Sequence, residues 1–181
     1  MSEPSFDSVF HPGPLPAAEL RRLLAVDPPL LENLADAERQ LTPNGVDLSL
    51  DEVARFSGDE PGVVDFDNGR RRLPAVEPLA WRGDRLELDP GSYLVRYAEK
   101  LNLPADVIAL GKPRSSLLRC GVELASAVWD AGYAGRGQGL LIVRHPAGLV
   151  LYRRARLLHL VFFRLTAPTA GYAGTYQNEG A

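Results

Sequence analysis

The 181-residue sequence has one cysteine, Cys120, and three histidines. An intramolecular disulfide is therefore excluded, and a zinc site built from Cys and His is disfavoured. Because no His lies near Cys120 in the sequence, we expect this residue to be a small core side chain rather than a nucleophile.

Long apolar runs and an excess of basic residues are also missing. The sequence contains no run of about 18 apolar residues and no charged start leading into an apolar segment, which argues against a membrane span and a signal peptide. Lys and Arg total 20 against 23 Asp and Glu, a net charge of −3 that argues against non-specific nucleic-acid binding. We expect a cytoplasmic protein with no membrane or nucleic-acid partner.

The remaining composition is that of an ordinary globular domain. Apolar residues make up 45% and charged residues 24%, and the length suits one domain with a sizeable core. Short apolar or alternating segments, separated by Gly and Pro, recur along the chain from Leu41 onwards. This pattern predicts an all-β antiparallel barrel or sandwich of jelly-roll type. The expected strands include 107–110, 122–129, 139–143, 149–152 and 157–165.

Three further segments carry specific β signals. Alternation in Val46–Leu50 predicts a half-buried strand. The turn sequence Asp67-Asn68-Gly69 predicts a tight hairpin between residues 63–66 and 70–73. Residues 86–88 and 93–97, on either side of Asp89-Pro90-Gly91, are expected to pair as neighbouring strands.

The N-terminal region differs from the rest. Residues 1–16 are rich in Pro, Ser and Gly and predict a loose arm. Ala17–Ala25 places Leu20, Leu23 and Leu24 on one helical face, and Pro16 suits the helix start. Residues 30–39 form a second, weakly patterned helical candidate.

The stretch Gly111–Gly135 carries the clearest chemical signal. It begins with a cluster of basic and hydroxyl side chains suited to phosphate: Lys112, Arg114, Ser115, Ser116 and Arg119. It ends at Asp130 in a turn, where a carboxylate can orient or deprotonate a water. The alternatives are a Ser-capped helix start with solvated arginines, and a turn Asp that only satisfies nearby backbone amides.

The motifs Pro113–Leu117 and Trp129–Gly135 resemble the deoxyuridine triphosphatase (dUTPase) and deoxycytidine triphosphate (dCTP) deaminase superfamily, most closely the archaeal-type dUTPases. Pro43–Leu48 and Gly171–Gln177 flank them in the order that the family shows, so that the resemblance covers roughly residues 41 to 180. It implies a distorted jelly-roll barrel, assembled as a homotrimer with sites at subunit boundaries. The implied division is an N-terminal arm with a short helix (1–40), a barrel domain (41–170) and a C-terminal lid segment (171–181).

The resemblance also implies roles for individual residues. Asp130 would contact the deoxyribose 3′-hydroxyl and orient the water that attacks the α-phosphorus. Tyr133 would pack under the deoxyribose, and Asp47 would be associated with Mg²⁺ and its waters. The triphosphate would be held by Arg114, Ser115, Ser116 and Arg119, partly from a neighbouring subunit.

Other implied contacts involve the base and the tail. The strand 122–128 would present its backbone to the base, with Ser126 as a candidate contact, and Gly135 would allow close approach of the hairpin. Tyr172, Tyr176 and Gln177 would belong to a lid that closes over the nucleotide. The alternatives without a role in binding are an aromatic side chain that closes a turn for Tyr133, a solvent-facing acid for Asp47 and a frayed chain end for the tail.

The sequence departs from the family in three respects. Thr175 replaces a Lys usual in the deaminases, and the Gly-rich final motif of the common trimeric triphosphatases is absent. His159 stands where the family often has Gln, and we expect it to be a packed core or interface residue.

Hydrolysis and deamination are distinguished by one position. The deaminases place a Glu proton shuttle in the strand after the Asp-Gly turn, whereas residues 131–146 here contain no carboxylate and Ile142 occupies the equivalent place. The predicted function is therefore Mg²⁺-dependent hydrolysis of dUTP to dUMP and pyrophosphate. The alternatives are a dCTP deaminase, alone or bifunctional, and a non-catalytic nucleotide-binding β-module.

Overall fold

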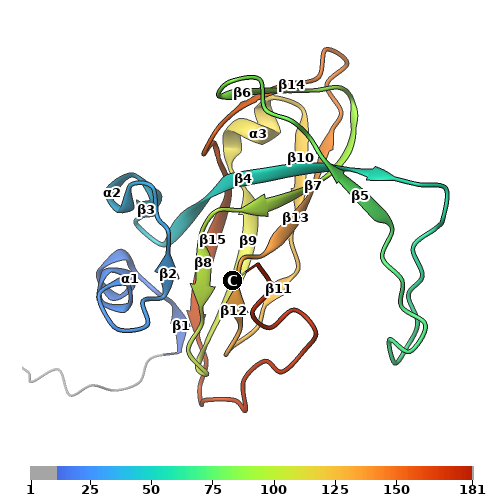
Figure 1. The fold of residues 1–181 in the computed structure, drawn as a ribbon. Helices are drawn as coiled ribbons and strands as arrows, with labels where there is room; N and C mark the ends of the chain where they lie inside the picture. The colour runs from blue at the N-terminus through green and yellow to red at the C-terminus, as the bar shows by residue number, and fades with distance from the viewer. Residues whose placement is uncertain (1–11, 181) are drawn as a thin grey trace, which may run out of the picture.

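The computed structural model describes residues 12–180, in which strands predominate and the helices are short (Figure 1). The helices are α1 (Ala17–Leu24), α2 (Ala37–Gln40) and α3 (Ser115–Arg119). The strands before α3 are β1 (Gly13–Pro14), β2 (Leu31–Glu32), β3 (Leu41–Thr42), β4 (Gly45–Ser57), β5 (Ala75–Pro78), β6 (Arg85–Leu88), β7 (Gly91–Tyr97), β8 (Lys100–Asn102) and β9 (Val107–Pro113). Those after it are β10 (Val122–Ala125), β11 (Val128–Trp129), β12 (Ala134–Gly135), β13 (Gln138–Val143), β14 (Leu149–Tyr152) and β15 (Arg156–Arg164).

The largest sheet has the strand order β10-β13-β7-β4-β15-β9-β11, with every pair antiparallel. It curls strongly, so that the chain forms a half-barrel around an apolar interior (Figure 1). Tyr97, Phe162 and Leu141 are among its fully buried side chains. The predicted β-barrel of jelly-roll type with a short N-terminal helical segment is confirmed.

Strand β4 is the long spine of the fold. Its first half is buried on both faces, including Asp47 and Ser49, so that the prediction of a half-buried strand there was wrong. The reason is that both polar side chains find charged partners inside the protein: Ser49 donates to Glu99, and Asp47 pairs with Arg114.

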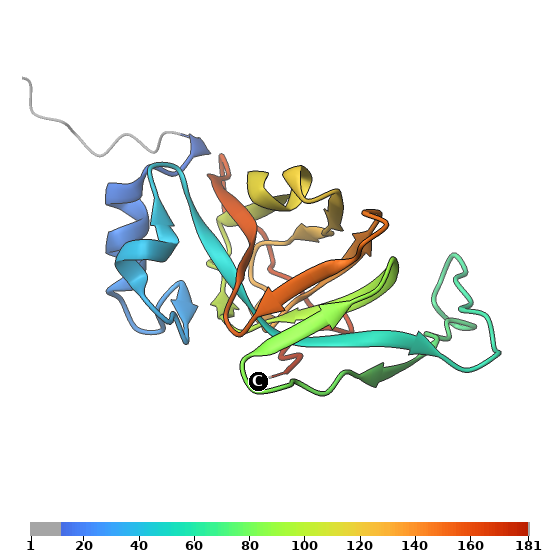
Figure 2. The ribbon, with the colours of Figure 1, turned by 90° about the horizontal axis from the view of Figure 1, so that it is seen from above.

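The second half of β4 leaves the body and pairs with β5 to form an arm, on the side opposite α1 and α2 (Figure 2). At the arm's tip the predicted turn is present, with Asn68 at a positive φ of 62°. The predicted flanking strands, 63–66 and 70–73, are not formed, because residues 63–72 share only one isolated bridge, Val63 to Arg72. Phe66 there is wholly exposed, and no facing sheet covers it within the described chain.

Two other strand predictions need correction. Residues 86–88 and 93–97 are strands but do not pair, because both edges of β7 are occupied by β4 and β13, and β6 pairs with β14 instead. The predicted strand 122–129 is broken at Ser126-Ala127 into β10 and β11, which pair with different neighbours.

The N-terminal residues 12–40 pack onto the barrel. The predicted helix is present as α1, with Leu20 and Leu23 buried and Arg21 and Arg22 exposed. The prediction of a helix over 30–39 was largely wrong: Leu30 and Leu31 enter the core beside β8, leaving only α2, which Asp36 caps. The prediction of a loose arm is also wrong for residues 12–16, because β1 pairs with β15 and Leu15 is buried. Residues 1–11 lie outside the described part.

Candidate active site

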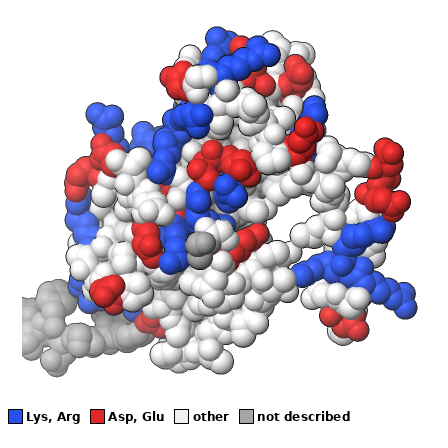
Figure 3. Space-filling model, viewed as in Figure 1, with Lys and Arg blue, Asp and Glu red and all other residues white. Residues whose placement is uncertain are grey.

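A pocket of about 610 Å³ lies between the β4–β5 arm and the body, within the size range of small-molecule sites. Figure 3 shows the hollow between arm and body on this face. The arm supplies apolar side chains, and the body supplies aromatic and polar ones. The lining residues from the arm are Phe56, Leu73, Pro74 and Val76, and those from the body include Leu94, Ser126, Trp129, Asp130, Tyr133, Gln138, Tyr172, Tyr176 and Glu179.

Asp130 stands at the pocket wall directly after β11. Its backbone carbonyl accepts the amide of Tyr133 at 3.1 Å, which closes the turn. Gly132 follows with φ +80°, and an added Cβ there would lie 2.6 Å from Gly171 Cα, so that only glycine fits. No partner for the exposed Asp130 carboxylate is present among residues 12–180. It is therefore free to act on a water or a ligand.

Aromatic rings form the floor beside this acid. Trp129 and Tyr133 lie edge-to-face with centroids 5.7 Å apart, and Tyr133 meets Tyr172 at the same separation. Burial, with smaller effects from Glu179 and Tyr172, raises the pKa of Tyr133 to about 12, so that its phenol stays protonated at neutral pH. The hydroxyl of Ser126 accepts the Trp129 indole N–H at 3.0 Å and donates to the Ala127 carbonyl, so that it holds the ring in place.

The C-terminal tail is fastened along the turn after Asp130. The Gln177 side chain accepts the Ala134 amide and donates to the Gly132 carbonyl, each at 3.0 Å. Gly135, at φ +150°, leaves room for the Tyr133 hydroxyl, which would lie 2.7 Å from an added Cβ. Tyr176 meets the arm, where the Arg71 guanidinium lies 5.4 Å from its ring centroid. Tyr172 and Tyr176 thus line the Asp130 pocket, whereas Gln177 fastens the tail to the turn.

The residues predicted to bind phosphate lie outside this pocket. Arg114, Ser115, Ser116 and Arg119 do not line this pocket; they lie at or on α3, near the other end of the barrel (Figure 1). Ser115, Ser116 and Arg119 are exposed. Cys120 at the end of α3 is exposed too, so its prediction as a core residue was wrong. In this five-residue helix only Leu117 is buried.

Comparison with known proteins agrees with this architecture. A family model described as dCTP deaminase-like matches residues 15–165. The chain belongs to the dCTP deaminase-like family. A Methanosarcina mazei protein named probable deoxyuridine 5′-triphosphate nucleotidohydrolase is 47% identical over 167 residues, 91% of this chain and 96% of that protein. An Archaeoglobus fulgidus protein of the same name is 43% identical over 161 residues, 89% and 94% of the two chains.

A solved structure of 2′-deoxycytidine 5′-triphosphate deaminase from Agrobacterium tumefaciens superposes with a TM-score of 0.61 at 26% identity. The match covers 84% of this chain and 48% of that one, so that this member of the dCTP deaminase-like family spans about half the length of the solved chain. In residues 12–180 no helix has the length and apolar composition that a bilayer crossing requires.

Two pocket residues of this dCTP deaminase-like protein, Gln138 and Glu179, were not predicted from its sequence. Ile142, expected to stand in for the deaminase Glu, does not line the pocket; its strand presents Gln138 there instead. Gln138 Nε2 donates to Glu179 Oε1 at 3.2 Å, so that the tail brings a carboxylate into the pocket. Burial raises the pKa of the Glu179 carboxyl above its ordinary value, and Arg96 opposes the shift. The only feature of the sequence that indicated this position was the polar side chain of Gln138 at the start of an apolar strand.

Asp47 lies away from the pocket, inside a cationic cluster. Its carboxylate is 2.8 Å from Arg114 Nε, 3.3 Å from Arg156 Nη1 and 3.0 Å from His159 Nδ1, and its side chain is only 4% exposed. His159 is therefore half-buried against an acid rather than packed in an apolar core. No group of three potential metal ligands occurs in residues 12–180, and two arginine partners leave Asp47 a poor direct ligand for Mg²⁺.

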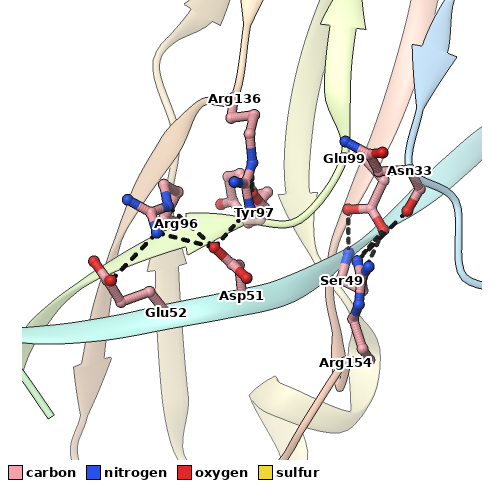
Figure 4. A network of polar contacts seen from close by, with 9 residues as sticks. All are labelled: Asn33, Ser49, Asp51, Glu52, Arg96, Tyr97, Glu99, Arg136 and Arg154. Carbon is pink, nitrogen blue, oxygen red and sulfur yellow. Dashed lines mark hydrogen bonds and ion pairs between the residues drawn. The ribbon is translucent and has the colours of Figure 1, made fainter. Parts of the chain in front are cut away.

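An ion-pair network joins β4 and β7 to Arg136, the residue after β12 (Figure 4). Asp51 lies between Arg136 Nη2 at 2.6 Å and Arg96 Nη2 at 3.0 Å. Burial disfavours ionisation of Asp51, but the hydrogen bonds and charges of the two arginines outweigh it and lower the pKa of its carboxyl. Arg136 directly follows Gly135, and its amide donates to the Glu179 carbonyl at 2.7 Å. The network thus anchors both the turn and the tail.

Proposed function

We propose that this protein hydrolyses dUTP to dUMP and pyrophosphate. The observation that carries the proposal is the Asp130 carboxylate, exposed and without a partner in the described chain, at the wall of a nucleotide-sized pocket floored by aromatic rings. The archaeal relatives named as probable dUTP nucleotidohydrolases, 43% and 47% identical over most of the chain, support the same reaction.

In the proposed reaction Asp130 orients a water toward the α-phosphorus and accepts one of its protons. A bond forms between the water oxygen and the α-phosphorus, and the bond from this phosphorus to the bridging oxygen breaks. Pyrophosphate leaves with that oxygen. Tyr133, a neutral phenol at the working pH, would pack under the deoxyribose, and Ser126 would act through Trp129 rather than through a hydroxyl contact of its own.

The charge of the pocket supports a shared site in a homotrimer. Within residues 12–180, the lining of the pocket includes two acids, Asp130 and Glu179, and no Lys or Arg. A triphosphate needs cationic donors. We propose that Arg114, Ser115, Ser116 and Arg119 supply them from a neighbouring copy, since α3 does not line the pocket of its own chain.

Magnesium belongs to this proposal as a partner of the substrate. When bound, Mg²⁺ would neutralise phosphate charge, and it commonly uses few protein carboxylates and keeps several waters. Asp47 does not fit direct coordination, so its predicted role would be confined to contact through water. Tyr172, Tyr176 and Gln177, in the lid segment 171–181 of which residue 181 lies outside the described part, would cover the nucleotide. A cytoplasmic location would suit this substrate.

The test is a pyrophosphate-release assay with Mg²⁺ that compares dUTP, dCTP and deoxythymidine triphosphate, with ammonia recorded in parallel. Pyrophosphate from dUTP, with little from the other two, is the expected result. Release of neither pyrophosphate nor ammonia from any of the three nucleotides would overturn the proposal and favour a non-catalytic binding module.

Deamination of dCTP is the second candidate, because one observation favours it. Glu179 places in the pocket the carboxylate that residues 131–146 lack. Against it, the strand side chain that faces the pocket is Gln138, an amide that cannot shuttle a proton. Ammonia released from dCTP in the assay above would establish this activity, alone or beside hydrolysis.

A further inference from the structure

We propose that Gln138 and Glu179 together read the edge of the pyrimidine base and select uracil over cytosine. The inference rests on the proposed function, because it assumes that a pyrimidine nucleotide occupies this pocket. It adds to that function a pair of side chains that distinguish the two bases.

The pair consists of two residues 41 positions apart whose side chains meet inside the pocket. Gln138 begins β13, where it lies opposite Arg96 of β7. Glu179 comes from the tail, and its side chain accepts the Gln138 Nε2 donor at 3.2 Å. Both side chains are half-buried, so that a ligand in the pocket would face them with little intervening water.

Their hydrogen-bonding capacity matches one base better than the other. A carboxamide nitrogen has two N–H donors, and one of them is used on Glu179 Oε1. The second donor can reach a carbonyl such as O4 of uracil, and the ionised Glu179 can accept the neighbouring N3–H. Cytosine presents an amino group and an unprotonated N3 at these places. The Gln138 N–H would then face an N–H donor, and the Glu179 carboxylate would face the lone pair of N3. The order of donor and acceptor therefore favours uracil.

The backbone around the pair is held firmly, as a base reader requires. The Glu179 carbonyl accepts the Arg136 amide at 2.7 Å, and Gly135 and Glu179 form a parallel bridge. The amide of Asn178 donates to the Ala134 carbonyl, also at 2.7 Å. Arg136 is itself bound to Asp51, as Figure 4 shows. These contacts tie the tail that carries Glu179 to the residues that follow Asp130.

Other polar side chains of the pocket are less suited to this task. Ser126 is committed to Trp129 and to the Ala127 carbonyl. Asp130 has only acceptors when ionised, so that it cannot present the mixed pattern by itself. Gln177 uses both ends of its amide on the turn. The combination of one donor and one acceptor remains for Gln138 and Glu179.

The test compares kcat/KM for dUTP and dCTP in the full-length protein and in the variants Glu179→Gln and Gln138→Leu. Glu87→Gln, the same chemical change at an exposed residue of β6, is the matched control. We expect each pocket variant to lower the dUTP preference by about tenfold or more, since a mismatched or lost polar pair inside a site is costly. The control should retain the wild-type ratio. An equal loss for both nucleotides, or an unchanged ratio in both variants, would overturn the inference.

Binding of dUMP and dCMP, measured by calorimetry, separates this inference from the proposed function. If the wild-type protein does not hydrolyse dUTP, the proposed function fails, but preferential binding of dUMP that both variants abolish would still support the base reader. If hydrolysis is present and the variants bind dUMP and dCMP with the wild-type preference, the proposed function stands and the base reader fails. Circular dichroism of each variant shows whether its fold is retained.

Discussion

The Arg114 guanidinium and the Asp47 carboxylate form an ion pair of 2.8 Å, which joins two motifs that the sequence assigned to different parts of a nucleotide site. The pair reaches across β15, since Asp47 is in β4, Arg114 directly follows β9, and β15 lies between these two strands. Because Asp47 is buried, it orients Arg114, compensates the charge of Arg156 and contacts the ring of His159.

Replacing Asp47 with Asn should therefore act mainly on stability. Removing one partner of a buried ion pair typically costs about 3 kcal/mol, and here the two arginines Arg114 and Arg156 would lose their counter-charge. Thermal unfolding measures this effect, with the exposed Asp84→Asn as the matched control. If Asp47 were a direct metal ligand, the variant would instead keep its stability and need much more Mg²⁺ for half-maximal turnover.

Asp130→Asn should retain nucleotide binding and lose turnover by about 10²- to 10⁴-fold, the usual contribution of a general base. The substitution is sterically neutral, and in the described chain no contact to the carboxylate is removed. Steady-state rates and dUMP binding are measured side by side, again with Asp84→Asn for comparison. Near-normal turnover would contradict the assignment of Asp130 as the residue that positions water.

Arg114→Ala should raise the KM for dUTP by about 10- to 100-fold, the effect of losing a charge-assisted hydrogen bond to phosphate. If the site is shared between copies, refolding a mixture of Arg114→Ala and Asp130→Asn chains should restore activity, since some interfaces then combine an intact Arg114 with an intact Asp130. Mixtures no more active than the separate variants would show that each pocket works alone.

The preference for dUTP should weaken as the pH falls. The pKa of Glu179 is raised by burial, so that its carboxylate is protonated at a higher pH than an exposed Glu, and the acceptor for uracil N3–H is lost there. Arg96 opposes this shift, while Tyr133 and Asp130 share the pocket. The stability effect has the opposite sign, because a raised pKa means that folding favours the protonated form, and this contribution is lost as the pH rises through the folded-state pKa.

The measurement is the ratio of kcat/KM for dUTP and dCTP as a function of pH. Glu179→Gln should have a pH-independent ratio over the acidic range, because an amide does not titrate there. A ratio that changes equally in the wild type and in Glu179→Gln would assign the dependence to another group, such as Asp130.

The resemblance of short motifs to the family singled out several residues that the structure brings together. Asp130, Tyr133 and the tail residues Tyr172 and Tyr176 were each singled out from motifs, and all line one pocket. Such motifs are readable because a turn such as Asp130–Tyr133 is set by the glycine and the acid within four consecutive residues.

Pairings between distant segments could not be read in this way. The alternation in Val46–Leu50 suggested one solvent-facing side, but Asp47 contacts His159, 112 residues away, and Ser49 contacts Glu99, 50 residues away. The strands 86–88 and 93–97 were predicted to pair because they are neighbours in sequence, yet the edges of β7 were already filled. Periodicity identifies a strand but does not tell which edges remain free.

The sequence by itself determined the class of fold, the short helix α1 and the turn that carries Asp130, because alternation, capping and glycine positions act over a few residues. Tertiary structure alone decided that Glu179 meets Gln138, that Arg114 is bound to Asp47 and that α3 lies away from the pocket of its own chain. These relationships depend on how a curled sheet brings distant strands and the tail together, which is set by the packing of the whole core and not by any short segment.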